Sequence, residues 1–224
     1  QHGQLWCGSS GGGLHRFDEH NWIAQSCPTD TIGSPITAIL RDRHDQLWCG
    51  TGRDGLYCLR GEQWASYTRA DGLAGDSIKA LCEDRAGHLW VGTDNGLCRF
   101  DGHTWTSDIS PKEASNNSIS SICEDDQARI WIGSGHFGAA RFDGSQWTRF
   151  NDPHSPLYRN SIHSMLPDRN GAIWIGSIQE LIHSDGENWR SLLPTEVTGH
   201  MWIHSLLEDR EGNLWVGCRD RVYR

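Results

Sequence analysis

Long apolar segments are missing from this sequence of 224 residues, whose mean hydropathy is −0.60. A membrane-spanning helix needs about 20 consecutive apolar residues, so we expect no membrane insertion. The first residues, 1–4, lack the charged and apolar regions of a signal peptide. They also lack an initiator methionine, which suggests a piece cut from a longer chain.

Basic residues are too few to balance the acidic ones. The sequence has 20 lysines and arginines against 29 aspartates and glutamates, which gives a net charge of −9. It also contains no basic run long enough to form a patch for nucleic acid. Because an acidic protein repels a phosphate backbone, we expect no nucleic-acid partner.

Motifs of catalysis and metal binding are missing as well. The sequence has no Gly-x-Ser-x-Gly motif, no Cys-x-x-Cys pair and no dense cluster of metal ligands. We find no paired acid and base on neighbouring segments of similar sequence. We therefore expect no catalytic residue, no metal and no cofactor.

Tryptophan, by contrast, is abundant and periodic. A tryptophan, one small or aliphatic residue and a glycine recur as a unit 41 to 43 residues apart, beginning at Trp6, Trp48, Trp90, Trp131, Trp174 and Trp215. A period of about 40–45 residues with several short strands per repeat is typical of a β-propeller blade. The sequence therefore predicts an all-β fold, a β-propeller of four-stranded antiparallel blades with about 42 residues per repeat.

The third repeat shows the order of its four strands, which we name A to D. Alternating residues predict strand A over 77–84, strand B over 88–92 and strand C over 96–100. An Asp101-Gly102 pair, a strong hairpin signal, leads into strand D around Trp105. The other repeats follow the same order.

We expect one propeller domain over residues 1–224. Its repeats cover approximately 1–34, 35–76, 77–117, 118–160, 161–201 and 202–224. The first repeat lacks strand A and the last lacks strand D, which predicts 22 strands and six blade positions with incomplete first and last blades. A five-bladed ring and a fragment of a larger propeller are the alternatives. Incomplete blades with unpaired strands also allow self-association or contacts with a parent chain.

The residues from Ile78 to Gly102 carry a recognisable pattern. It reads Ile-x-x-Leu-x-x-Asp-Arg-x-Gly-x-Leu-Trp-x-Gly-Thr-x-x-Gly-Leu-x-x-Phe-Asp-Gly. This pattern resembles the two-component regulator propeller repeat, and the resemblance covers essentially the whole chain. It implies a propeller fold and a sensor role, since members usually form the extracytoplasmic sensor part of hybrid histidine kinases and recognise carbohydrate or other signals. It implies no catalytic residues.

Eleven of the 12 tryptophans occupy repeated positions in strands B and D, so we expect them to pack the blades. Trp202 is the exception, because it stands just before strand A, where other repeats have proline or serine. It is a candidate stacking platform for a ligand, and local packing is the alternative.

The eight cysteines mostly replace aliphatic residues of other repeats. Cys7 and Cys49, for example, stand where Val91 and Ile132 stand elsewhere. They are expected to be small core residues rather than disulfides or zinc ligands. Unpaired core thiols favour a reducing compartment and thus the cytoplasm, whereas the family resemblance favours a periplasmic or extracellular location.

The second position of strand A lies beside the axis of a propeller. His163 and His204 hold this position in successive repeats, but two histidines without a third ligand make a weak metal site. We expect the side chains at this position to line the channel: Thr37, Lys79, Ser120, His163 and His204.

Strand direction places the A–B and C–D turns on one face and the B–C and D–A loops on the other. The turns hardly vary between repeats, whereas the loops differ at every repeat, and variable loops on a rigid scaffold commonly carry recognition. The candidate ligand-binding residues of the loop face are Arg53, Asp94, His136, Phe137, His154, Tyr158, Arg159, Gln179, His200 and Trp202.

The sequence therefore predicts a non-catalytic recognition or sensor module that binds a small molecule, glycan or protein on the B–C/D–A face. One alternative is a lyase or hydrolase with its site at the channel mouth, because propellers host such chemistry. The other alternative is an assembly or scaffold element.

Overall fold

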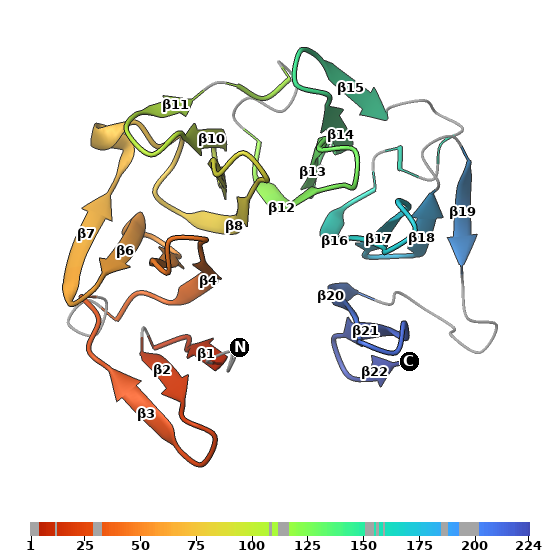
Figure 1. Ribbon diagram of the computed structural model, residues 1–224. Coiled ribbons are helices and arrows are strands. Elements are labelled where there is room, and N and C mark those ends of the chain that lie inside the picture. The colour runs from red at the N-terminus through yellow and green to blue at the C-terminus, as the bar shows by residue number, and fades with distance from the viewer. Residues whose placement is uncertain are drawn as a thin grey trace. The chain divides into compact units, whose positions relative to one another are not determined.

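The computed structural model describes residues 5–11, 13–28, 33–107, 109–111, 117–150, 155, 157–158, 160–184, 188–192 and 202–224. These residues form 22 strands in six antiparallel sheets and one short 3-10 helix (Figure 1). The predicted fold class is confirmed, since each sheet is one propeller blade and only the first and last sheets have three strands instead of four. The chain divides into two compact units, one of residues 1–83 and 87–109 and the other of residues 84–86 and 110–224.

The first unit contains three sheets. The first sheet consists of β1 (Leu5–Gly8), β2 (Leu14–Phe17) and β3 (Trp22–Gln25). The second consists of β4 (Ile36–Arg41), β5 (Leu47–Thr51), β6 (Leu56–Arg60) and β7 (Gln63–Tyr67), which the 3-10 helix η1 (Arg69–Asp71) follows. The third consists of β8 (Ile78–Glu83), β9 (Leu89–Thr93), β10 (Gly96–Phe100) and β11 (Trp105–Ser107).

The second unit also contains three sheets. The fourth sheet consists of β12 (Ile119–Glu124), β13 (Ile130–Ser134), β14 (Gly138–Phe142) and β15 (Trp147–Phe150). The fifth consists of β16 (Ile162–Pro167), β17 (Ile173–Ser177), β18 (Leu181–Ser184) and β19 (Trp189–Leu192). The sixth consists of β20 (Ile203–Glu208), β21 (Leu214–Cys218) and β22 (Val222–Tyr223).

The glycine of four Trp-x-Gly units, namely Gly8, Gly50, Gly133 and Gly176, makes room for the first residue of strand A in the next sheet. A Cβ atom on Gly50 would lie 2.5 Å from Cγ2 of Ile78, the first residue of β8, and one on Gly133 would lie 2.5 Å from Cγ2 of Ile162. Both isoleucines are fully buried. Glycine therefore allows neighbouring sheets to pack closely, which explains its recurrence.

Three tryptophans of strand B, namely Trp48, Trp131 and Trp215, donate their indole N–H to the aspartate of the preceding A–B turn. The carboxylate of Asp42 accepts the indole N–H of Trp48 at 2.8 Å, and that of Asp125 accepts the indole N–H of Trp131 at 2.8 Å. Trp48 and Trp131 are buried, as the packing prediction requires. Trp22 and Trp215 are exceptions, with exposed fractions of 50% and 37%, and both belong to three-stranded sheets.

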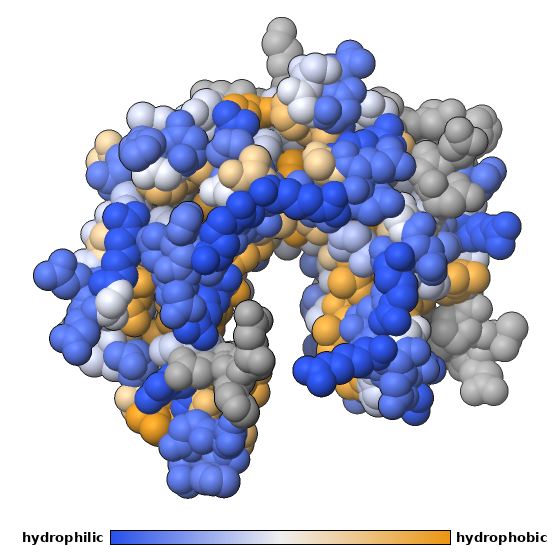
Figure 2. Space-filling view, viewed as in Figure 1, coloured by the Kyte–Doolittle hydropathy of each residue, from blue (hydrophilic) through white to orange (hydrophobic). Residues whose placement is uncertain are grey.

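Hydrophilic residues cover most of the visible face, and apolar residues lie there in separate patches (Figure 2). Among the described residues, no helix is long and apolar enough to cross a membrane.

Candidate functional site

A pocket of about 400 Å³ lies where loops of the second and third sheets meet in the first unit. Its lining comes only from B–C and D–A loops, so loops of the predicted variable face lie together here. The lining residues are Gly52, Arg53, Arg69, Gly75, Asp76, Ser77, Asp94 and Asn95. Arg53 and Asp94 were both predicted as ligand contacts.

Backbone hydrogen bonds fix the two B–C loops of this pocket. The N–H of Gly52 donates to the carbonyl of Pro35 at 2.9 Å, and the N–H of Asp94 donates to the carbonyl of Ser77 at 2.9 Å. In both cases a B–C loop is tied to the residue that precedes strand A of the same blade. The side chains of Arg53 and Asp94 therefore project from a fixed backbone.

The D–A loop between β7 and β8 is ordered by its own carboxylates. Asp71 accepts the backbone N–H of Thr68 at 2.8 Å, as in a capping box at the start of η1. Asp76 accepts the backbone N–H of Arg69 at 2.8 Å, which closes the loop on itself. Arg69 is thus presented from a rigid turn.

Gly75 brings this loop against the opposite one. A Cβ atom here would collide with Oδ1 of Asp94 and would lie 2.9 Å from Oγ1 of Thr93. Any larger residue would push the Asp94 carboxylate away, so the pocket depends on glycine at this point.

Three charged groups of the pocket do not pair with one another. Within the described part of the chain, the guanidinium groups of Arg53 and Arg69 and the carboxylate of Asp94 make no hydrogen bond or ion pair, and all three residues are exposed. These three groups remain available to a ligand.

A larger cavity of about 520 Å³ lies among turns of the opposite face in the same unit. Two of its arginines already have partners in the protein, since Arg41 donates to Asp45 at 2.6 Å and Arg60 donates to the hydroxyl of Tyr67 at 3.0 Å. The turns that line it also vary little between repeats. This cavity is the weaker candidate for recognition.

The predicted channel-lining residues share one backbone feature. In every described strand A, the register slips at the second position, where a β-bulge sets one residue outside the regular pairing. The residues at these bulges are Thr37, Lys79, Ser120, His163 and His204. Their role in lining a channel stays a prediction.

Two of these bulged residues link neighbouring sheets. The hydroxyl of Thr37 donates to the carbonyl of Ile78 in the next sheet at 2.7 Å, and the hydroxyl of Ser120 donates to the carbonyl of Ile162. Sequence reasoning missed this role. A small hydroxyl side chain at the same position of two repeats was the signal.

His163, Trp202 and His204 gather into one aromatic cluster in the second unit. The ring centroid of His163 lies 6.4 Å from that of Trp202 and 5.9 Å from that of His204, and the His163 and Trp202 rings are nearly parallel at 20°. Burial, followed by the charge of His204, lowers the pKa of His163. Its Nε2 atom is buried and has no hydrogen-bond partner among the residues that the structure describes.

Trp202 is held in an unusual backbone conformation. Its φ of 46° lies in the left-handed region, which is unfavourable for a bulky residue. The backbone N–H of Trp202 donates to the carbonyl of Ile178 at 3.0 Å, and the residue keeps an exposed fraction of 37%. Strained residues of this kind occur often at functional sites.

The remaining predicted contacts are scattered over the second unit. His136, Tyr158 and Gln179 are exposed. Phe137 is only 6% exposed and lies beneath the guanidinium of Arg149, whose Cζ is 5.9 Å from the ring centroid, so it packs in the interior. Three further candidates lie outside the described residues: His154, Arg159 and His200.

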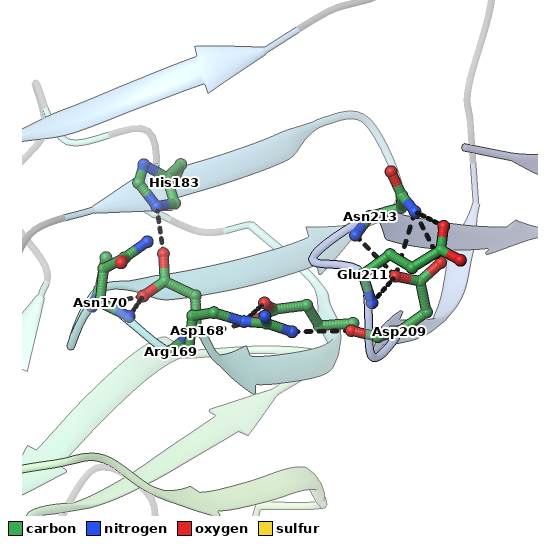
Figure 3. Close-up of polar contacts among 9 residues, drawn as sticks. Asp168, Arg169, Asn170, His183, Asp209, Glu211 and Asn213 are labelled. Atoms are coloured by element: carbon green, nitrogen blue, oxygen red, sulfur yellow. Dashed lines mark hydrogen bonds and ion pairs between the residues drawn. The ribbon is translucent and has the colours of Figure 1, made fainter.

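The A–B turns carry a second feature that sequence reasoning missed. Arg169 extends from its own turn to the next sheet, where it pairs with Glu208 and donates to the carbonyl of Asp209 at 2.7 Å (Figure 3). In the first unit, Arg43 pairs with Glu83 in the same way at 2.7 Å. The sequence signal was an arginine directly after the A–B turn aspartate of one repeat and a glutamate directly before the corresponding aspartate of the next repeat. On this face, side chains of the A–B turns therefore connect neighbouring sheets through ion pairs.

Metal binding finds no support in the residues that the structure describes. No three or more His, Cys, Asp or Glu side chains among them converge as ligands would.

Comparisons with known proteins identify the repeat. The two-component regulator propeller model matches residues 72–95, 113–136, 159–179 and 198–220. No curated protein matches the chain significantly.

Solved structures share the fold. The extracellular domain of a one-component system from B. thetaiotaomicron is 24% identical with a TM-score of 0.77, and 98% of this chain aligns with 30% of that one. The extracellular domain of a hybrid two-component system from the same organism is 22% identical with a TM-score of 0.77, over 96% of this chain and 30% of that one. Virginiamycin B lyase from Staphylococcus aureus is 14% identical with a TM-score of 0.76, over 96% of this chain and 74% of that one.

At 14–24% identity, these solved structures share the fold of this chain. The chain spans less than a third of the length of the two B. thetaiotaomicron extracellular-domain chains.

Proposed function

Because the chain carries the repeats of the two-component regulator propeller family, we propose that it is a non-catalytic recognition module of a sensor protein. Its ligand site is the pocket formed by Arg53, Arg69 and Asp94 on the B–C/D–A loop face.

One observation carries this proposal. The pocket is lined by the variable loops alone, its backbone is fixed by hydrogen bonds, and three of its charged groups have no partner in the described part of the chain. Unpaired charges on a rigid frame suit ligand recognition, because little conformational entropy is lost on binding.

We further propose an extracytoplasmic location. The two B. thetaiotaomicron structures are extracellular domains, and the cytoplasmic location expected from free thiols finds no support. Cys49, Cys58 and Cys98 are fully buried, and burial raises the pKa of each thiol. Buried, protonated thiols are unreactive and persist in either compartment, so free cysteines do not identify a reducing one.

The function is tested by screening the full chain by calorimetry against glycans, amino acids and small metabolites. We expect at least one compound to bind, and Arg53→Ala combined with Asp94→Ala to abolish its binding. Arg210→Ala, at an exposed arginine of the turn face, is the matched control and should bind normally. Binding that survives the double substitution would place the site elsewhere, and turnover of a bound compound would refute a non-catalytic role.

A further inference from the structure

We infer that the pocket of Arg53, Arg69 and Asp94 binds a small amphoteric molecule that carries both a carboxylate and an ammonium group, as a free amino acid does. This inference rests on the proposed function and names the ligand class for the same site.

The chemistry of the lining excludes an apolar ligand. Every lining residue is charged, polar or glycine, and none has an aliphatic or aromatic side chain. A ligand that buried apolar surface here would desolvate charged groups without any apolar contact in return. The ligand must therefore be polar over most of its surface.

The two arginines call for an anion. The guanidinium groups of Arg53 and Arg69 line one pocket, and neither has a partner among the described residues. A guanidinium presents paired donors whose planar geometry matches a carboxylate, and such charge-assisted pairs are stronger than neutral hydrogen bonds. A neutral sugar would offer neither guanidinium a charged partner.

Asp94 calls for a cation on the same ligand. Its carboxylate comes from the B–C loop after β9, leans over Gly75 and makes no hydrogen bond or ion pair within the described residues. Arg53 and Arg69 come from other loops, after β5 and β7. A purely anionic ligand would be repelled by Asp94, whereas an ammonium would neutralise it.

The overall charge and size agree with this class. Two arginines and two aspartates line the pocket, and one oxygen of Asp76 already accepts the backbone N–H of Arg69. The site is therefore close to neutral and is matched by a zwitterion. Its volume of about 400 Å³ lies in the range of sites for small molecules.

Blocked amino acids test the two charges separately. The full chain is titrated by calorimetry with the free L-amino acids, and the tightest binder is then compared with its N-acetyl derivative and its carboxamide. We expect each blocked form to bind at least about tenfold more weakly, because each lacks one charged partner. D-glucose and D-glucuronate serve as a neutral and a purely anionic control, and neither should bind.

Variants then assign each charge. Arg69→Gln should weaken the binding of the free amino acid and of the N-acetyl form but leave the binding of the carboxamide unchanged. Asp94→Asn should weaken the binding of the free amino acid and of the carboxamide but leave the binding of the N-acetyl form unchanged. Thermal unfolding of both variants checks that the fold is kept, and Arg210→Gln is the control.

Three outcomes would contradict the inference. If no free amino acid binds, or if blocking the amine or the carboxylate has no effect, the ligand class is wrong. If D-glucose or another neutral compound binds and is lost in the Arg53→Ala, Asp94→Ala variant, the ligand class is wrong but the proposed function stands.

Discussion

The surroundings of His163 favour the neutral form of its imidazole. It lies beside Trp202 and His204, and burial and the charge of His204 lower its pKa below the ordinary value of about 6.5. The unfolded chain therefore binds a proton here at a higher pH than the folded chain does. Stability from this group is fully present above the ordinary pKa and is lost as pH falls from that value through the lower pKa of the folded protein.

Thermal unfolding between pH 7.5 and pH 5.5 measures this effect. We expect the melting temperature to fall by up to about 3 °C more in the natural chain than in His163→Gln, because the glutamine cannot take up a proton. His44→Gln, at an exposed turn histidine, is the control and should follow the natural chain. Identical pH profiles for the natural chain and His163→Gln would contradict the prediction.

The eight cysteines differ sharply in exposure. Cys7 is exposed, whereas Cys49, Cys58 and Cys98 are fully buried, and burial raises the pKa of the Cys98 thiol to about 12. Because the thiolate is the reacting form, a thiol-specific disulfide reagent should modify Cys7 first in the native protein.

Absorbance of the released reagent follows this reaction. We expect one fast phase, absent from Cys7→Ser, and modification of the buried thiols only after denaturant is added. A fast phase that survives in Cys7→Ser would show that another thiol is accessible.

The paired arginine and glutamate of successive A–B turns join one strand A to the next. Where Asp126 replaces the arginine, the next strand A ends at Pro167 instead of glutamate. Both members of the pair are thus lost together, which indicates that they act as a unit. Arg169 is half-exposed and Glu208 is mostly buried, so their coupling is expected to be modest.

A double-mutant cycle with Arg169→Gln and Glu208→Gln measures this coupling from urea unfolding. We expect about 0.2–1 kcal/mol, decreasing at high salt. A parallel cycle of Glu208→Gln with Arg190→Gln, an exposed arginine of β19, should be additive. Equal coupling in the two cycles would mean that the pair has no specific role.

Strand positions followed from the sequence more readily than contacts did. Alternation and turn residues predicted strand C of the third repeat at 96–100, where β10 lies, and strand A was placed within one residue at each end. The bulges escaped prediction because a pattern with period two does not show one extra residue. Their position nevertheless coincides with the residues that repeat comparison had singled out.

The pocket could be predicted only in part. Loop variability pointed to Arg53 and Asp94, but Arg69 and Gly75 were not selected, because their importance depends on two loops meeting in space. Phe137 shows the opposite error of reasoning, since a residue in a variable loop was treated as exposed although its ring is buried beneath Arg149. Loop diversity indicates a face of the molecule, but it does not tell which side chains of that face point outward.

The last sheet leaves apolar side chains uncovered. Leu207 and Val222 are 61% and 64% exposed, and Trp215 is 37% exposed, whereas Trp48 and Trp131 at the same position of other repeats are buried. Exposed apolar clusters of this kind mark interaction surfaces. We therefore expect copies of the chain to associate through the sheet of β20, β21 and β22.

Sedimentation velocity over a range of concentrations tests this expectation. The average sedimentation coefficient should rise with concentration for the natural chain, and Leu207→Lys with Val222→Lys should remove the rise, because charge on the sheet opposes burial. Leu192→Lys, at an exposed leucine of β19, introduces the same charge on another sheet and should leave association unchanged. A coefficient independent of concentration in the natural chain, or association that survives the double substitution, would show that this surface does not join copies of the protein.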